Sequence, residues 1–465
     1  MTTMQTLTSS DPATGAPLGT VALTSPGDLE AALERAQAAL DGPWSRDASA
    51  RSRALGAWGD AIAANADELA ELIMRETGKL RGEAAFEIAL AVDAVRFNAG
   101  LARHVDGQAG GLPDGSIAFV EREPVGVAAF IVPWNAPAIL LLRDLAPALA
   151  AGVTAVVKPA PQTPLSTERL VELAEGAGIP PGVLGVVHGG PELGRALVEH
   201  PVVRSVAFTG STATGRAIMR SAAEDLTRVL LELGGKSAAI VCDDADVDAA
   251  AAGCLRSGLS IAGQFCMATT RIIAQRGVYD AVREAVCERA EQVAVGAPDD
   301  PASGMGPLIS EQQLDRVDGY IDLARADGSV AVGGQRLHTD SGGAYLAPTV
   351  LAGDRLDGRL LREEIFGPVL TVEPFDRIED GVALANLSPY GLAGSVWTTN
   401  VDRAWTAARG MRAGTVAVNR ANAAFAEIAS GGMGQSGIGR TRGLEGIHAF
   451  TELKHVNWSP AAPEH

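Results

Sequence analysis

The sequence predicts an α/β protein with two doubly wound α/β domains. Short β-rich runs alternate with helical runs from about Val125 to Gly235, and the same alternation returns from about Ala238 to Asn419. The first hundred residues, by contrast, are mainly helical by period. Because strands that alternate with crossover helices lie parallel, each alternating region is expected to form an open sheet with helices on both faces. Ligands of such sheets bind beyond the carboxyl ends of the strands.

The N-terminal helical layer is predicted from apolar residues at helical spacing. In residues 27–40, Leu29, Leu33, Ala36 and Leu40 recur with this period. Residues 66–79 repeat the pattern and meet a helix stop at Gly78. This layer by itself indicates no function.

The strands and helices of the two alternating regions follow in order. In the first region the predicted strands are 125–132, 154–160, 183–189, 203–210 and 227–235, and the predicted helices are 140–152, 167–178, 191–200 and 212–225. In the second region the predicted strands are 238–242, 270–275, 367–375, 394–399 and 414–419. The interval from Glu232 to Cys266 crosses the join between the two regions, so we expect a site in the cleft between the domains.

The composition indicates a globular protein of two or three domains that binds neither nucleic acid nor membranes. The chain has 465 residues, 47% of them apolar, and a formal net charge of -18. An acidic chain without a Lys/Arg cluster does not attract phosphate backbones or anionic lipid. The N-terminus lacks the layout of a secretory signal, and no apolar stretch reaches the roughly 20 residues of a membrane span. We therefore expect a cytoplasmic protein.

The four cysteines do not form a disulfide framework, and no cysteine or histidine spacing suggests a metal site. Cys242, Cys254 and Cys287 fit small buried apolar side chains. Cys266 differs, because it follows a Gly-Gln-Phe run, and Glu232 lies between a strand-like run and two glycines. An unperturbed thiol is only a few per cent ionised at neutral pH, so a nucleophilic Cys266 needs a base such as Glu232. Such a pair can capture a carbonyl carbon and later hydrolyse the resulting thioester.

Two segments resemble phosphate-binding turns. The segment GMGQSG (432–437) matches GxGxxG, but no strand precedes it and no helix-forming run starts in it, so we reject it. In residues 203–225 a strand turns through Gly210 into a helix, whose first N–H groups can face a phosphate. Gly215 would let that helix pack closely.

Nine motifs together resemble the ordered series of the aldehyde dehydrogenase superfamily, of the hydrolytic type that does not acylate CoA. They are ETGK (76–79), PWNAP (133–137), KPAPQTP (158–164), FTGSTATG (208–215), LELGGK (231–236), GQFC (263–266), EEIFGPV (363–369), YGLAGSVWT (390–398) and GQSGIGR (434–440). The 34 residues from Glu232 to Cys266 are also similar to the family's spacing between base and nucleophile. The resemblance covers nearly the whole chain.

The resemblance implies an NAD(P)-dependent oxidation of a small-molecule aldehyde to its carboxylic acid. Cys266 would form a thiohemiacetal and then a thioester, which water activated by Glu232 would hydrolyse. The Asn135 amide and the Cys266 N–H would hold the oxyanion; by sequence alone, Asn135 also fits a turn former. The implied domains are a cofactor-binding domain (1–105 and 124–235), a catalytic domain (236–430) and a β oligomerisation element (106–123 and 445–465) that joins a homodimer or homotetramer.

The resemblance also implies a cofactor site. It places Ser211 on a phosphate oxygen, Lys158 and Trp134 near the adenosine, and Glu364 with Phe366 around the nicotinamide ribose. Further cofactor-binding residues implied in this way are Ile131, Pro133, Gly194, Phe208, Gly210, Gly215 and Leu233. Pro161 stands where the family often has a Glu that binds the adenosine ribose, so both NAD and NADP remain open, with NAD favoured.

The expected substrate is an aromatic or bulky aldehyde. Ala136 and Ser430 stand where aromatic residues often line the family's aldehyde tunnel, and Phe265 precedes the nucleophile. Arg143 either pairs with a distal carboxylate, as in semialdehyde dehydrogenases, or is structural and ion-paired. The alternatives are therefore a semialdehyde dehydrogenase that uses Arg143, and a thiol esterase or hydrolase without redox chemistry. Thr269, usually Gly in the family, has no predicted effect.

Overall fold

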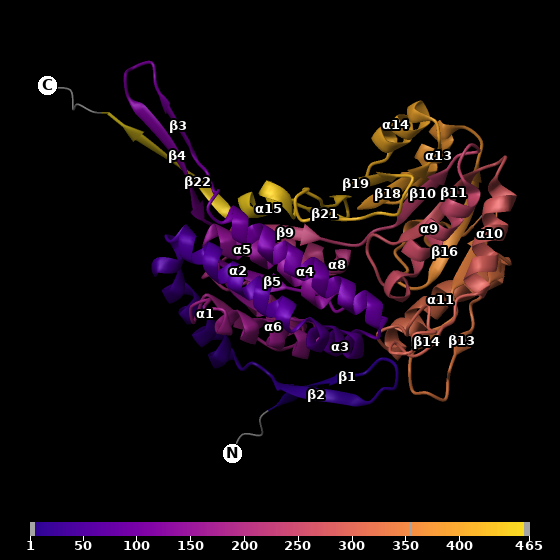
Figure 1. The fold of residues 1–465 in the computed structure, drawn as a ribbon, viewed down its shortest axis with the longest axis horizontal. Coiled ribbons are helices and arrows are strands. Elements are labelled where there is room, and N and C mark those ends of the chain that lie inside the picture. Colours follow the sequence, from indigo (N-terminus) through magenta and orange to yellow (C-terminus); the bar gives the residue numbers. More distant parts are fainter. Residues whose placement is uncertain (1–4, 354–355, 460–465) are drawn as a thin grey trace.

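The computed structural model describes residues 5–353 and 356–459. Two sheets, each covered by helices on both faces, form two lobes, and a small third sheet projects from the first lobe (Figure 1). The predicted fold class is therefore confirmed. Residues 1–4 of the predicted cofactor-binding domain and residues 460–465 of the predicted oligomerisation element lie outside the described residues.

The first sheet has the strand order β21-β9-β8-β5-β6-β7, and all of its strands except β21 run parallel. These strands are β5 (Val127–Ile131), β6 (Thr154–Lys158), β7 (Leu184–Val186), β8 (Val203–Thr209), β9 (Arg228–Glu232) and β21 (Gly437–Ile438). Side chains alternate between two cores: Ala128 and Phe130 point to one face, and Val127 and Ala129 point to the other. Each of the five predicted strands of this region is present.

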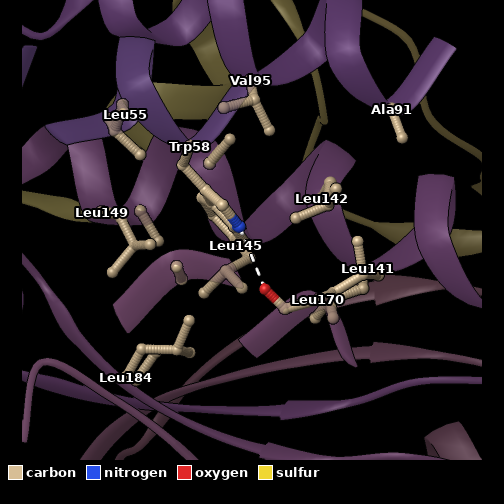
Figure 2. Close-up of a cluster of buried hydrophobic side chains, with 14 of the residues drawn as sticks. Leu55, Trp58, Ala91, Val95, Leu141, Leu142, Leu145, Leu149, Leu170 and Leu184 are labelled. Atoms are coloured by element: carbon tan, nitrogen blue, oxygen red, sulfur yellow. Dashed lines mark hydrogen bonds between the residues drawn. The ribbon is translucent and has the colours of Figure 1, made fainter. Parts of the chain in front are cut away.

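Helices cover both faces of this sheet. One face packs against α2 (Ala48–Ala64), α3 (Ala66–Thr77), α4 (Arg81–Leu101), α5 (Pro137–Ala151) and α6 (Pro164–Gly176), and the other against α1 (Pro26–Leu40), α7 (Pro191–Val198) and α8 (Thr212–Ala222). Trp58 of α2 lies fully buried at the centre of the larger core, and its Nε1 donates to the Leu170 carbonyl at 3.0 Å (Figure 2). This bond satisfies the one polar group of a large core side chain.

The second sheet has the order β12-β15-β16-β11-β10-β18-β19, with β12 as an antiparallel edge strand. Its strands are β10 (Ser237–Val241), β11 (Thr269–Gln275), β12 (Val330–Val332), β15 (Thr349–Ala352), β16 (Val369–Phe375), β18 (Ala393–Trp397) and β19 (Thr415–Val418). The covering helices are α9 (Val247–Leu259), α10 (Tyr279–Glu291) and α11 (Glu311–Asp327) on one face, and α13 (Ile378–Ala385) and α14 (Val401–Gly410) on the other. The strands β12 and β15 were not predicted, because they are only three and four residues long.

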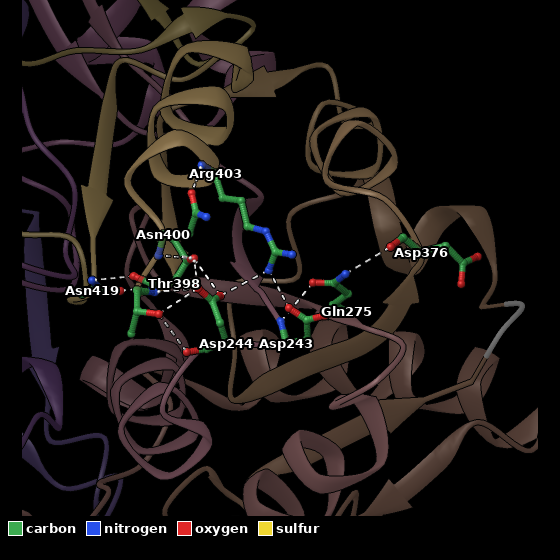
Figure 3. Close-up of polar contacts among 9 residues, drawn as sticks. Asp243, Asp244, Gln275, Asp376, Thr398, Asn400, Arg403 and Asn419 are labelled. Carbon is green, nitrogen blue, oxygen red and sulfur yellow. Dashed lines mark hydrogen bonds and ion pairs between the residues drawn. The ribbon is translucent and has the colours of Figure 1, made fainter.

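The carboxyl edge of this second sheet is closed by polar contacts (Figure 3). Thr398, after β18, donates to Asp244 at 2.7 Å, and Arg403 of α14 pairs with Asp243. The Asp243 backbone N–H in turn donates to Gln275 at 3.0 Å. The opposite, amino edge of the sheet faces the cleft between the lobes. Residues that line this cleft come just before β10, β11 and β18 in the chain.

The third sheet consists of β3 (Gln108–Gly111), β4 (Ile117–Pro124) and β22 (Thr451–Trp458), in the order β22-β4-β3. It extends away from the first lobe as a long arm (Figure 1). Apart from Pro124, it falls within the segments predicted to join subunits (106–123 and 445–465). That role and the domain boundaries stay predictions.

The remaining elements are short, apart from one hairpin near the N-terminus. This hairpin, β1 (Thr6–Ser10) with β2 (Pro17–Ala22), was not predicted, because its short polar strands lack an apolar alternation. The others are η1 (Pro43–Ser45), η2 (Ser260–Gly263), α12 (Gly358–Arg362), α15 (Gly443–His448), β13 (Arg336–Leu337), β14 (Tyr345–Leu346), β17 (Tyr390–Gly391) and β20 (Met433–Gly434). Within the described ranges, no helix combines the length and apolar character needed to cross a bilayer.

Candidate active site

Cys266 and Glu232 lie where two pockets meet in the cleft between the lobes. We call the larger one, of about 450 Å³, the apolar pocket, since its walls include Leu90, Ile139 and Phe425. The second, of about 230 Å³, is the central pocket. Cys266, Glu232 and Leu140 line both pockets. One thiol and one carboxylate therefore face two ligand spaces at once.

A strained loop carries Cys266 to this position. Ile261 and Ala262 have φ of 52°, and Gly263 has φ of 73°. A Cβ added at Gly263 would lie 2.1 Å from the Gly367 carbonyl oxygen, so this position requires glycine. Strain of this kind persists where the surrounding structure enforces it. Here Glu83 of α4 contributes, because its carboxylate accepts the Ile261 N–H at 2.8 Å.

Asn135 approaches Cys266 through the same loop. Its Nδ2 donates to the Gln264 carbonyl at 2.9 Å, and it lines the central pocket with Cys266. The Gln264 side chain accepts the Ile309 N–H at 2.9 Å, which fixes the carbonyl that orients Asn135. The structure thus brings together all three residues predicted to carry the chemistry.

Glu232 ends β9 and is buried without a full set of partners. Its Oε2 lies 3.9 Å from Nη1 of Arg143, and its Oε1 has no hydrogen-bond partner among the residues that the structure describes. Burial raises the pKa of Glu232 to about 7, with the positive charges of Arg143 and Arg442 acting against it and Asp144 acting with it. A carboxylate with a pKa near 7 suits a general base at neutral pH.

The Cys266 thiol is held in its protonated form in this structure. Burial first, and then the negative charge of Glu364, raise the pKa of Cys266 to about 12. The thiol therefore needs a proton acceptor before it can act as a nucleophile.

Arg143 is already occupied by protein groups. Its guanidinium donates to Asp144 at 2.9 Å and to the Thr209 hydroxyl at 2.8 Å, in addition to facing Glu232. Of the two roles considered for Arg143 from the sequence, this geometry favours the structural, ion-paired one.

Sequence reasoning missed Arg442, which lines the apolar pocket together with Cys266, Glu232 and Arg143. It lies just before α15, in a loop that β21 brings to the site by pairing Gly437 with Glu232. The only signal in the sequence was an arginine directly before Gly443, beyond the last motif. Phe265 lines this pocket too, as expected for a substrate contact, and so does Ser430.

The central pocket contains aromatic and acidic residues. The rings of Trp134 and Phe366 meet edge to face, 5.5 Å apart, and Phe366 has a left-handed φ of 60°. Glu364 accepts the Gly235 N–H at 2.9 Å. Further predicted residues on this wall are Pro133, Gly210, Ser211 and Leu233.

A third pocket, of about 720 Å³, lies beyond the carboxyl ends of β5 and β6, and we call it the outer pocket. Lys158, Ile131, Gly194 and Pro161 line it. Trp134 and Lys158, expected at the same end of a cofactor, thus line different pockets: the Trp134 ring packs against Phe366 instead.

The turn from β8 into α8 separates the central and outer pockets. Ser211 caps α8 by accepting the Thr214 N–H at 3.2 Å, and Phe208 packs beneath Gly210. A Cβ at Gly215 would lie 2.6 Å from Leu233, so this glycine does allow the close packing that the sequence suggested. The rejected GMGQSG segment forms turns around β20 and β21, and no helix begins in it.

Comparisons with known proteins agree on one family. The model of the aldehyde dehydrogenase family matches residues 1–456. The chain is 40% identical over 459 residues to a 2-hydroxymuconic semialdehyde dehydrogenase from Pseudomonas sp. strain CF600. The aligned region covers 96% of this chain and 94% of that protein. Among solved structures, it is similar to an NAD-dependent aldehyde dehydrogenase from Sinorhizobium meliloti, with a TM-score of 0.96, 38% identity and coverage of 99% and 93%. A betaine aldehyde dehydrogenase from Staphylococcus aureus in complex with NAD+ gives a TM-score of 0.94, 36% identity and coverage of 97% and 91%.

Proposed function

The chain belongs to the aldehyde dehydrogenase family, and from this we propose that it oxidises an aldehyde to the carboxylic acid with NAD, through an acyl intermediate on Cys266. One observation carries the proposal. Cys266 and Glu232 line both the apolar pocket and the central pocket, so one thiol reaches an aldehyde on one side and a hydride acceptor on the other.

The central and outer pockets fit a dinucleotide. The outer pocket opens at the N-terminal turns of α7 and α8, whose N–H groups favour a pyrophosphate. Lys158 is buried there, where it donates to the Pro159 carbonyl at 3.2 Å, and burial lowers its pKa to about 8. Trp134, Glu364 and Phe366 would enclose the nicotinamide end. When bound, NAD supplies the acceptor for the hydride that leaves the aldehyde carbon.

The first chemical task of the protein is to form a bond between sulfur and the aldehyde carbon. Cys266 loses its proton, for which the unpartnered Oε1 of Glu232 is the available acceptor, and the sulfur adds to the carbonyl carbon. The carbonyl oxygen becomes an oxyanion, which the Asn135 Nδ2 and the Cys266 backbone N–H hold. One such donor is worth about 3 kcal/mol in an enclosed site.

The second task is to release the acid. After hydride loss the acyl group remains on Cys266 as a thioester. Glu232 first releases the Cys266 proton to solvent and then removes a proton from a water molecule. The resulting hydroxyl adds to the acyl carbon, and the Cys266 sulfur leaves as a thiolate, which takes the proton back from Glu232. A pKa of about 7 keeps a useful fraction of Glu232 ionised at neutral pH.

The volume and lining of the apolar pocket support an aromatic or bulky aldehyde. Ala136 and Ser430 are small, and Phe265 and Phe425 supply aromatic walls. The second candidate is a semialdehyde with a distal carboxylate. It is favoured by the partly buried Arg442 in this pocket and by the substrate named for the Pseudomonas relative.

The nucleophile is tested with Cys266→Ala. We expect this variant to lose aldehyde-dependent NADH formation, measured at 340 nm, while it retains NAD binding. Cys287→Ala, which removes a half-buried thiol of α10, is the matched control and should retain full turnover. Full turnover by Cys266→Ala would contradict the proposal.

The base is tested with Glu232→Gln in a rapid-mixing experiment. We expect NADH formation to slow in both the burst and the steady phase, because the carboxylate accepts a proton from Cys266 before hydride loss and a proton from water during deacylation. A steady phase as fast as that of the wild type would contradict this assignment. Assays with NADP in place of NAD test the cofactor, since Pro161 leaves the outer pocket without a carboxylate at that position. Hydrolysis of a thiol-reactive ester without any aldehyde oxidation would favour the esterase alternative.

We also propose that the arm formed by β3, β4 and β22 joins copies of the chain in a homodimer or homotetramer. Its strands expose Phe119, Leu453, Val456 and Trp458, an unusual amount of apolar surface for a projecting sheet. Light scattering on the intact chain should give a dimer or tetramer mass. A monomer at micromolar concentration would contradict this role.

A further inference from the structure

Arg442 has a backbone conformation that arginine rarely adopts. Its φ is 64° and its ψ is 175°, which lies in a region that is essentially restricted to glycine. The next residue is a glycine with φ of 55°. Strained backbone conformations cluster at active sites and ligand-binding sites, so this one, at a pocket wall, points to a function for the Arg442 side chain.

The Arg442 side chain is partly buried with little to hold its charge, and this burial lowers the pKa of its guanidinium to about 10. Its Nη1 donates to the Ser430 hydroxyl at 2.9 Å, and within residues 5–353 and 356–459 it makes no ion pair. Arg143, in the same pocket, has Asp144, Thr209 and Glu232 around it. Taking a guanidinium even partly out of water is costly unless an anion pairs with it, and Arg442 lacks the carboxylate partner that Arg143 has in Asp144.

The charges around Arg442 leave room for one more negative group. The groups that act on it electrostatically are Arg143, Asp144, Glu232 and Cys266. Arg143 and Asp144 largely cancel each other, and Cys266 is protonated. Glu232, with a pKa of about 7, is partly neutral at physiological pH. The exposed Asp93 and Arg420, which also line the pocket, offset each other. The pocket is thus positive on balance, through Arg442, in the state in which Glu232 holds a proton.

The remaining arginine of the pocket is a weaker candidate. Arg420 is exposed, and its guanidinium lies over the Phe425 ring at 5.7 Å from the centroid. An exposed charge is screened by water and binds a carboxylate weakly. Arg442 lies deeper and is directed by Ser430.

We propose that Arg442 binds a carboxylate at the far end of the substrate, so that the enzyme prefers aldehydes that carry a distal carboxylate on an apolar body. The proposal rests on the proposed function. The sequence suggested Arg143 as a residue that could bind such a carboxylate. We assign this role to Arg442 instead, which lies outside the sequence motifs. Ser430 would orient the guanidinium, and the apolar walls would hold the body of the substrate.

The test compares matched pairs of aldehydes with NAD as the cofactor. The pairs are 4-carboxybenzaldehyde with benzaldehyde, and succinic semialdehyde with butanal. We expect the wild-type protein to favour the carboxylated member in kcat/KM. In Arg442→Met this preference should fall about 10- to 100-fold, the range of one charge-assisted hydrogen bond to a buried group. Arg442→Lys should retain part of the preference, and Arg420→Met should change it by less than about threefold.

A binding measurement separates substrate recognition from turnover. Terephthalate, the product of 4-carboxybenzaldehyde, should raise the Tm of the wild-type protein more than benzoate does, and Arg442→Met should abolish that difference. Arg442→Gly provides a second variant that suits the backbone, and it should fold at least as well as the wild type. If Arg442→Met does not fold, Arg442→Gly carries the same comparison.

The outcomes distinguish the two proposals. A wild-type protein that oxidises no aldehyde with NAD would contradict the proposed function. A wild-type protein that oxidises benzaldehyde and butanal but shows no preference for carboxylated partners would contradict only the role of Arg442. The same holds for a preference that survives in Arg442→Met, or one that is lost in Arg420→Met instead.

Discussion

Replacing Arg143 by Met should raise the pKa of Glu232 and move the pH dependence of deacylation. Nη1 of Arg143 lies 3.9 Å from Oε2 of Glu232, and both side chains are buried. With an effective dielectric constant of about 20, a unit charge at that distance contributes about 4 kcal/mol, or about 3 pKa units. Because the charge is spread over the guanidinium and water can enter the variant, we expect a rise of one to two units, roughly, above the present value of about 7.

The sign follows from the role of Glu232 as a base. It acts in its ionised form, so the steady rate of NADH formation should increase as pH rises through its pKa. In Arg143→Met the midpoint of this increase should therefore move from near pH 7 to about pH 8 or higher. Rapid mixing over pH 5 to 10 separates the burst of NADH from the steady phase. The pH midpoint of the steady rate then measures the shift in the pKa of Glu232.

Two matched variants control this experiment. Arg143→Lys keeps the charge, so its midpoint should stay within about half a unit of the wild type. Arg143→Met leaves Asp144 buried without its partner, which destabilises the fold by about 3 to 5 kcal/mol. The double variant Arg143→Met/Asp144→Asn removes both charges, and its midpoint should return toward pH 7, since Asp144 raises the pKa of Glu232. An unchanged midpoint in Arg143→Met would refute the electrostatic argument.

Three further predictions concern stability and the strained loop. Because the pKa of Glu232 is raised in the folded state, the free energy of unfolding falls as pH rises from about 4.5 to 7. Glu232→Gln should therefore raise the free energy of unfolding by about 3 kcal/mol at pH 8 and change it little at pH 5. Thermal unfolding at both pH values measures this difference. Glu83→Ala removes the acceptor of the Ile261 N–H and should lower kcat about tenfold or more without changing NAD affinity, whereas Glu71→Ala, at an exposed ion pair, should change neither. Trp58→Phe removes the indole bond to the Leu170 carbonyl and leaves a gap in the core, and it should cost about 1–3 kcal/mol in denaturant unfolding.

The sequence predicted the two sheets because their central strands follow simple local rules. Strands such as β5 and β10 are apolar on both faces and lie between amphipathic helices, so pattern and fold agree. The β1–β2 hairpin was missed, because its pairing depends on a turn and on packing against α3 and α6 rather than on apolar alternation.

The candidate site was predicted where residues belong to motifs, and missed where long-range packing decides. Cys266, Glu232 and Asn135 were identified, and the structure brings them together. Arg442 is brought to Glu232 by the antiparallel pairing of β21 with β9, more than 200 residues apart in the chain, which no local pattern reveals. For Arg143, the sequence could not tell that Thr209 would accept its hydrogen bond.

The closed carboxyl edge of the second sheet has a practical consequence for protein engineering. Cys266 precedes β11, so the turn after Gln275 is separated from the reactive sulfur by a whole strand, about 20 Å. A peptide tag or reporter domain inserted at that turn would meet solvent and the covering helices, and not the reacting groups. The second lobe thus offers an attachment point at which foreign sequence leaves the chemistry of the opposite edge intact.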